Sequence, residues 1–302
     1  MFVVKYRKLF YVLSALIVAA SIVSISVWGL KPGIDFKGGS ILEVVYSLPR
    51  PEQVAVESAI NKLDVGASIR PTGEAGFIIR MRDISQDEKS ALDKVLLGFG
   101  STTQVRFDSV GPLLGVEAIK KSVASIVLVL IAIILFIAFA FRKVSQPVNS
   151  WKYGLIAILA LAHDVIVPTG IFAALGHFKG YEVDTLFVTA LLVVLGFSIH
   201  DTIVVFDRVR ENLGRAKANK PFEEIVGESI SQTFTRSINT SFTTLLALIV
   251  LYFVGGESTH EFSLALIIGI TAGTYSSVFL GSPLLVTVEK WQNRKMNKGG
   301  KK

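Results

Sequence analysis

An acidic side chain lies inside an apolar stretch that is long enough to cross a lipid bilayer. The stretch runs from Leu186 to Phe206 and carries Asp201, directly after His200. An ionised carboxylate in the middle of a membrane costs about 2.5 to 3.5 kcal/mol, so a passive anchor would have an apolar residue there. The residue therefore predicts an ion or proton relay, a substrate path or a paired switch. The structural alternative is a static ion pair, or a carboxylate that reaches the interface.

A second polar pair, His163 and Asp164, lies four residues before Pro168 in another apolar stretch. Proline inside a helix removes a backbone hydrogen bond and can kink the helix. Charged residues are rare inside membranes and usually have a role there. Asp164 could be a member of a proton relay or a structural hydrogen-bonding group. His200 lies about 100° around the helix from Asp201, so it need not share that site.

Arg236 begins a polar stripe on the fifth apolar stretch. Thr240, Thr243 and Thr244 follow it at helical spacing, which puts all four side chains on one helix face. Because successive membrane helices run in opposite directions, Asp201 and Arg236 both lie near the inner side and could meet. A cation favours the ionised carboxylate and burial favours the neutral one, which is the competition that a switchable proton site needs. Taken alone, Arg236 is better explained by the excess of basic residues on the inner side of membrane proteins.

The composition indicates a membrane protein without a resident cofactor. The 302 residues are 51% hydrophobic and only 18% charged, whereas soluble domains have about 25% charged residues. Cysteine is absent, which excludes disulfides, thiolate metal sites and cysteine nucleophiles. The chain has four histidines but no H-E-x-x-H motif and no Walker A motif. We therefore expect no metal, no cofactor and no enzymatic reaction, and any energy must come from a partner ATPase or an ion gradient.

Six apolar stretches are long enough to span the membrane. They are Leu9–Trp28, Ser122–Phe141, Tyr153–Leu175, Thr185–Val205, Ser237–Val254 and Phe262–Val286. The short outer loops, 176–184 and 255–261, contain Lys179 as their one basic residue, which predicts that both termini are on the inner side. The net charge of +7 then reflects topology and contact with anionic lipids rather than nucleic-acid binding. The first stretch is longer than a signal-peptide core, so we expect an uncleaved helix.

The segment between the first two spans predicts an α+β domain on the outer side. Its elements follow the order β-α-β-β-α-β: 40–47, 51–63, 67–71, 77–82, 85–99 and 102–110. This order is that of a ferredoxin-like domain. The segment offers no nucleophile–base arrangement, so we interpret it as a binding or structural module. The predicted organisation is residues 1–30 as inner terminus and first helix, 31–121 as outer domain, 122–286 as helices two to six, and 287–302 as a basic inner tail.

Three further features concern packing. Asp35 with Gly38 and Gly39 is expected to fix the turn into the first strand rather than bind an ion. Residues 222–234 have the pattern of an amphipathic helix lying on the inner membrane surface. Small residues recur every four positions on the sixth span and predict a face for close helix packing. These are Gly269, Gly273, Ser277 and Gly281.

Several of these motifs resemble the SecF subunit family of the bacterial protein translocase, which is related to RND transporters. They are Gly33–Ser40, Ala160–Asp164, Gly196–Asn212 and Gln232–Ser237. The third of these motifs contains Asp207, Arg208, Glu211 and Asn212. The resemblance covers the whole chain. It implies an α-helical polytopic membrane protein with one set of six helices, half of an RND-type transporter, in the bacterial cytoplasmic membrane.

The resemblance also implies function and partners. It implies an accessory subunit that pairs with SecD and uses the proton motive force to complete export of preproteins through the SecYEG translocon, beside a YajC-type accessory subunit. Asp201 and Arg236 are then the relay residues, with Asp164 and His200 as further candidates. Two alternatives stay open: half of a small-molecule or lipid exporter, or a scaffold in which Asp201 and Arg236 form a permanent pair. Proton and sodium coupling are not distinguished.

Overall fold

The computed structural model describes residues 2–47, 49–140, 148, 150–216 and 220–299. The chain forms two compact units. We call residues 32–124 with 183–185 the α+β unit, and residues 1–31, 125–182 and 186–302 the membrane unit. The predicted end of the second span at Phe141 and the last three residues of the predicted basic tail lie outside the described residues.

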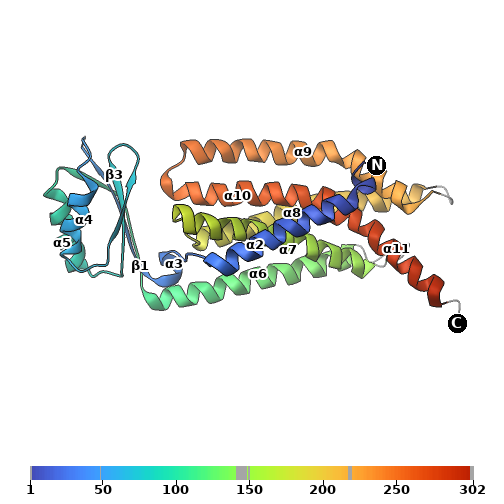
Figure 1. The fold of residues 1–302 in the computed structure, drawn as a ribbon, viewed down its shortest axis with the longest axis horizontal. Coiled ribbons are helices and arrows are strands. Elements are labelled where there is room, and N and C mark those ends of the chain that lie inside the picture. Colours follow the sequence, from blue (N-terminus) through green and yellow to red (C-terminus); the bar gives the residue numbers. More distant parts are fainter. Residues whose placement is uncertain (1, 48, 141–147, 149, 217–219, 300–302) are drawn as a thin grey trace. The chain divides into compact units, whose positions relative to one another are not determined.

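The α+β unit has the ferredoxin-like topology that the sequence predicts. Its elements are β1 (Gly39–Tyr46), α4 (Gln53–Asn61), β2 (Ser68–Thr72), β3 (Gly76–Met81), α5 (Gln86–Leu97) and β4 (Thr102–Val110), as Figure 1 shows. The strand order is β2-β3-β1-β4, and every neighbouring pair is antiparallel. Leu42 and Val44 of β1, Phe77 of β3 and Leu92 of α5 are buried in the core between the sheet and the helices.

Helix α5 begins at the predicted capping box. The Ser85 hydroxyl accepts a hydrogen bond from the Glu88 backbone N–H at 3.3 Å, and the Glu88 carboxylate accepts one from the Ser85 backbone N–H at 2.8 Å. Both of these backbone donors would lack a partner in an uncapped helix. The Arg82 guanidinium also donates to Glu88. The first turn of α5 is therefore fixed by three polar side chains.

The glycine pair at the start of β1, Gly38 and Gly39, has two physical reasons to be glycine. Gly38 and Gly39 have φ angles of +76° and +134°, which side chains rarely tolerate. A Cβ at Gly38 would lie 2.9 Å from the Pro112 backbone, and one at Gly39 would lie 2.7 Å from the Met81 carbonyl oxygen. The pair follows a short helix, α3 (Ile34–Lys37), which the sequence analysis did not predict. The two glycines allow the first residues of β1 to pass close to the backbones of β3 and of the beginning of α6.

The membrane unit contains long helices that lie side by side (Figure 1). They are α2 (Arg7–Trp28), α6 (Pro112–Ala140), α7 (Ser150–Lys179), α8 (Thr185–Arg215), α9 (Phe222–Val254) and a continuous stretch formed by α10 (Glu257–Tyr275), the π-helical turn η1 (Ser276–Gly281) and α11 (Ser282–Gly299). A short helix, α1 (Phe2–Lys5), precedes α2. Among the described residues, six helical segments are long and apolar enough to cross a membrane. This agrees with the predicted six spans.

Small residues let these helices approach one another closely. Gly269 of α10 faces Val194 of α8, and a Cβ at Gly273 would lie 2.9 Å from the Cβ of Ser198. A Cβ at Gly170 of α7 would likewise overlap Ser21 of α2. The predicted small-residue face of the sixth span is thus confirmed: Gly269 and Gly273 approach α8, and Gly281 lies beside Ala160 of α7. Such contacts are the usual means of helix association in lipid.

The second predicted span lies in a helix that begins earlier, at Pro112, because proline suits the first helical position and the polar residues after it continue the helix. One sequence-based expectation was wrong. The predicted surface helix 222–234 is the first part of the continuous helix α9. Its apolar residues Val226 and Ile230 are buried in the same core cluster as Val4. That face therefore packs against this chain and does not lie on lipid.

The glycine pair leads to a stability prediction. Gly39→Ala should lower the local opening free energy of β1 by more than the 1 to 2 kcal/mol or so of left-handed strain, because the new methyl group also meets the Met81 carbonyl. Hydrogen exchange of the full-length chain, followed by mass spectrometry on β1 and β3 peptides, measures this loss. Gly73→Ala is the control, since Gly73 has a φ of +52° and nothing lies within 4 Å of the position that a methyl group would take there. Equal losses in both variants would contradict the close-approach explanation.

The capping box leads to a prediction about pH. The hydrogen bond from Arg82, with further bonds from Ser85, lowers the pKa of Glu88 from its ordinary 4.5 to about 2. A depressed carboxyl pKa stabilises the fold above the unfolded-state value, and this stabilisation disappears as the pH falls from about 4.5 through about 2. We expect α5 to lose exchange protection, corrected for intrinsic rates, over this window.

Glu88→Gln should remove this pH dependence of α5, because glutamine does not titrate. Glu74→Gln, which changes an exposed carboxylate in the turn between β2 and β3, should leave the dependence as in the unaltered chain. The capping explanation fails if the Glu88→Gln chain still loses protection over the same window.

Candidate functional site

Asp201 is buried in the middle third of the long helix α8, with a side chain that is 3% exposed. Its Oδ2 atom is buried and has no hydrogen-bond partner within the described part of the chain, and the same holds for the hydroxyl of Ser237 on α9. The two groups lie next to each other. A buried acceptor and a buried donor thus face each other across α8 and α9 without a hydrogen bond of normal geometry.

Two other relay candidates, Arg236 and His200, do not contact the Asp201 carboxylate directly. Arg236 precedes Ser237 on α9 and is exposed at the surface of the chain, and His200 is exposed as well. Both act on the Asp201 carboxylate electrostatically, but no ion pair within 4 Å joins them to it among the described side chains. The predicted direct contact between Asp201 and Arg236 is therefore not made in this conformation.

Asp164 has a very different environment. Its side chain is fully buried and is held by donors from three elements. His163 lies with Nδ1 2.9 Å from Oδ1, Ser276 of η1 donates to Oδ2 at 2.8 Å, and Ser198 of α8 also donates to Oδ2. These contacts join α7, α8 and η1 around one carboxylate. We call Asp164, His163, Ser198 and Ser276 the Asp164 cluster.

Tyr275 connects the Asp164 cluster to α2. Its ring stacks on the His163 imidazole with the centroids 5.9 Å apart. Its hydroxyl donates to the Phe10 carbonyl at 3.2 Å and accepts from Ser14 at the same distance. The π-helical turn η1 begins directly after Tyr275. Such turns are rare and are frequently found at functional sites.

The motif residues that follow Asp201 lie on the end of α8. They form ion pairs along the helix: Asp207 with Arg210 at 2.6 Å, Arg208 with Glu211 at 2.6 Å, and Arg215 with Glu211 at 2.9 Å. These side chains are about half exposed, so each pair contributes little stability. Asn212 has a distinct role, because it donates to Ser229 at 2.8 Å and to Gln232 at 3.1 Å and so ties α8 to α9.

Asp35 caps a membrane helix. Its Oδ2 accepts a hydrogen bond at 3.0 Å from the backbone N–H of Thr185, the first residue of α8. A carboxylate at a helix N-terminus satisfies a free donor and interacts favourably with the helix dipole. Val183 also accepts from the Gly33 N–H at 2.9 Å. The motif around the glycine pair therefore fixes the start of α8 as well as the start of β1.

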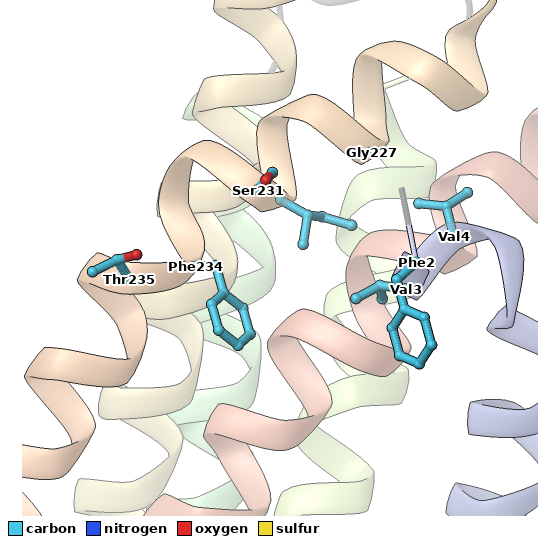
Figure 2. A pocket seen from close by; sticks show the side chains of 8 residues that line it. Phe2, Val3, Val4, Gly227, Ser231, Phe234 and Thr235 are labelled. Atoms are coloured by element: carbon cyan, nitrogen blue, oxygen red, sulfur yellow. The ribbon is translucent and has the colours of Figure 1, made fainter.

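Two cavities lie among the helices of the membrane unit. One, of about 310 Å³, is lined by α9 and by α10 with its continuation, and includes Phe242 and Tyr275. The other, of about 290 Å³, lies between the N-terminal residues Phe2 and Val4 and the first half of α9, where Phe234 and Thr235 line it (Figure 2). Among the described residues, no group of three or more His, Asp or Glu side chains could hold a metal ion.

Sequence reasoning missed the partners of Asp164. Ser198, Ser276 and Tyr275 carry no signal of their own, since serine and tyrosine are common in membrane helices. The spacing Gly269–Gly273 on the sixth span indicated a close approach, but it did not identify α8 as the partner. Ser198 precedes Asp201 by one helical turn on the same face of α8, which would have been the one available clue.

Comparisons with known proteins agree with the fold and the motifs. The model for the protein export membrane protein SecD/SecF C-terminal region matches residues 92–291, and the model for the SecD/SecF GG motif matches residues 23–47. The protein translocase subunit SecF of Thermobaculum terrenum is 44% identical, with 97% of this chain and 94% of the relative covered. The protein of the same name from Anaerolinea thermophila is 38% identical, with 95% and 94% covered.

Solved structures give the same result. The crystal structure of SecDF, a translocon-associated membrane protein from Thermus thermophilus, matches 96% of this chain with a TM-score of 0.82 and 30% identity. This chain spans 38% of that larger protein. A crystal structure of SecDF in the Super-membrane-facing form matches with a TM-score of 0.65. With its family models, its full-length relatives and its fold in agreement, this multi-pass membrane chain belongs to the SecD/SecF family of protein export membrane proteins.

Proposed function

We propose that this chain acts as a SecF-type subunit that pairs with SecD and couples the proton motive force to the completion of protein export. The observation that carries the proposal is the buried Asp201 carboxylate, which lies beside Ser237 in a membrane-length helix without a hydrogen bond to Oδ2 from the described residues. Buried polar groups are otherwise nearly always satisfied. An acceptor left open inside a membrane unit is a site where a proton can bind and leave.

The energy of one proton is sufficient for such a role. One charge that crosses a potential of 100 mV supplies about 2.3 kcal/mol, which shifts a two-state equilibrium by well over tenfold. In the ionised state Asp201 attracts the Arg236 guanidinium, and in the neutral state it does not. Because Arg236 lies on α9 next to Ser237, a change of charge on Asp201 alters the force between α8 and α9. Asp164 and His200 are further relay candidates.

A partner with a homologous set of helices would complete the unit. The likeness to SecDF, in which this chain corresponds to 38% of the length, supports SecD as that partner. The polar stripe of α9 supports it as well, since Arg236, Thr240 and Thr243 are exposed on a membrane-length helix. Polar side chains on membrane helices generally face other helices. The SecYEG translocon, a YajC-type subunit, the exported preprotein and membrane lipids are the other proposed partners.

The proposed location is the bacterial cytoplasmic membrane with both termini on the cytoplasmic side. In this arrangement residues 1–30 form the terminus and first helix, and residues 31–121 form the extracytoplasmic domain. Residues 122–286 contain helices two to six, and residues 287–302 form a basic cytoplasmic tail. The excess of Lys and Arg in the segments assigned to the inner side supports this orientation.

Asp201→Asn should abolish the gradient-dependent part of export, because asparagine cannot exchange a proton. The measurement is completion of preprotein translocation in membrane vesicles containing SecYEG, SecD and this chain, with and without an imposed gradient. We expect at least a tenfold loss of the gradient-dependent rate, in line with the energy of one charge. Assembly with SecD is measured in the same vesicles.

Asp207→Asn is the matched control, since it removes an exposed carboxylate from the same helix six residues further on, and should retain the gradient response. If Asp201→Asn vesicles assemble normally and still respond to the gradient, Asp201 is a packing residue. The coupling would then belong to Asp164 or to the partner subunit, or the chain would be a scaffold.

The exposed stripe of α9 predicts where the partner binds. The chain has no cysteine, so Thr240→Cys introduces a unique site for a benzophenone photo-crosslinker. Illumination in membranes should give an adduct with the combined mass of this chain and SecD. Leu128→Cys on α6, where the side chain is 68% exposed on an apolar helix, is the control and should give little adduct. A stronger adduct from Leu128→Cys than from Thr240→Cys would exclude this assignment of the interface.

A further inference from the structure

We infer that His163 and Asp164 form a proton-binding pair in the membrane unit, with the proton taken up at Nε2 of His163. Asp164 is one of the relay candidates described above, whereas His163, which takes up the proton, is not. The inference concerns proton binding by this chain alone, so it does not depend on what the bound proton drives or on the proposed export function.

The contacts of Asp164 indicate an ionised carboxylate. Oδ1 lies 2.9 Å from His163 Nδ1, and Oδ2 receives the Ser198 hydroxyl. The Ser276 oxygen lies 2.8 Å from Oδ2 and 3.1 Å from the Gly273 carbonyl, so its proton has its shorter contact with the carboxylate. An ionised carboxylate accepts at both oxygens and donates nothing, and bonds to a charged acceptor are the stronger ones. The three donors match that state.

The geometry then fixes the tautomer of His163. If Nδ1–H donates to Asp164, the neutral ring carries its lone pair on Nε2. Nε2 is buried, in a side chain that is 3% exposed, and it has no hydrogen-bond partner within the described residues. The Tyr275 ring covers the imidazole, but the Tyr275 hydroxyl is occupied by Phe10 and Ser14. Nε2 is therefore an open acceptor next to a carboxylate.

Charge balance gives this acceptor a reason to bind a proton. A neutral His163 beside an ionised Asp164 leaves one negative charge in a buried site, which is costly unless it is compensated. Proton transfer from hydronium breaks one O–H bond, forms one N–H bond at Nε2, releases water and makes the pair electrically neutral. The imidazolium then lies in direct contact with its counter-ion.

The other charged groups around the pair come from neighbouring helices. Tyr275 of α10 is the titratable side chain that contacts the imidazole face. From α8, Ser198 contacts Asp164, and Asp201 follows Ser198 by one turn on the same face, with His200 beside it. Arg236 of α9 interacts electrostatically with Asp201. Protonation of His163 therefore changes the charge beside Ser198, which lies one helical turn from Asp201 on α8.

The test is nitrogen NMR of the full-length chain with ¹⁵N-labelled histidine, in lipid nanodiscs. The chain has four histidines, and the signals lost in the single variants His177→Gln, His200→Gln and His260→Gln assign the fourth signal of the unaltered chain to His163. At high pH we expect the neutral Nδ1–H tautomer of His163. Between about pH 9 and pH 5 we expect Nε2 to become protonated.

Two controls make the outcome specific. His177 is exposed on the same helix α7 and serves as the reference histidine in the same sample. In Asp164→Asn the pair has no charge to balance, and the His163 transition should move by at least one pH unit relative to His177.

The inference is overturned if the neutral ring of His163 is the Nε2–H tautomer, or if its protonation state stays constant over this range while His177 titrates. An unchanged His163 transition in Asp164→Asn overturns it equally. If Asp164→Asn does not fold, the tautomer and the titration in the unaltered chain still decide.

Discussion

The membrane unit depends on satisfying carboxylates inside helices that are otherwise apolar. Serine side chains are short, so they reach a carboxylate on another helix only where the two backbones come close. Gly273 provides that approach, because its missing side chain leaves room for Ser198 of α8. Ser276 then lies near enough to Asp164 to donate from η1. Small residues therefore determine whether the Asp164 cluster can form, although they have no polar function themselves.

The two buried aspartates differ in how completely they are satisfied. Asp164 is enclosed by α7, α8 and η1 and has three donors. Asp201 lies at the contact between α8 and α9, and its Oδ2 has no hydrogen bond within the described residues. The helix α9 lies at the edge of the bundle, beside α10 (Figure 1). A carboxylate at an edge can respond to a moving neighbour, whereas one held from three sides resists movement.

The fold was predictable to a large extent because its signals are local. Apolar length gave the six spans, and the alternation of elements with the Ser85 capping box gave the ferredoxin-like order. The errors arose where tertiary packing decides. Residues 222–234 have an amphipathic pattern that suits a membrane surface as well as a protein core, and the pattern alone does not distinguish the two. The capping of Thr185 by Asp35 joins residues far apart in the sequence, so no local pattern shows it.

The candidate site was predictable only in its charged members. Charge inside an apolar stretch identified Asp164 and Asp201, because charge is rare there. Their partners are hydroxyl groups, which occur throughout membrane helices and gave no comparable signal. The π-helical turn at Ser276 was equally hidden, since it depends on backbone geometry and not on composition.

The polar stripe of α9 shows that the need to satisfy polar groups inside apolar helices extends beyond this chain. Two of the threonines are satisfied within α9: Thr243 donates to the Asn239 carbonyl at 3.0 Å and Thr244 to the Thr240 carbonyl at 3.0 Å. Such bonds to the preceding turn let hydroxyls lie in hydrocarbon without a partner. A guanidinium has five N–H donors and a full charge, which its own helix backbone cannot satisfy. Arg236 therefore needs acceptors on another helix more than the threonines do, and this need ties the position of α9 to the charge on the groups around it.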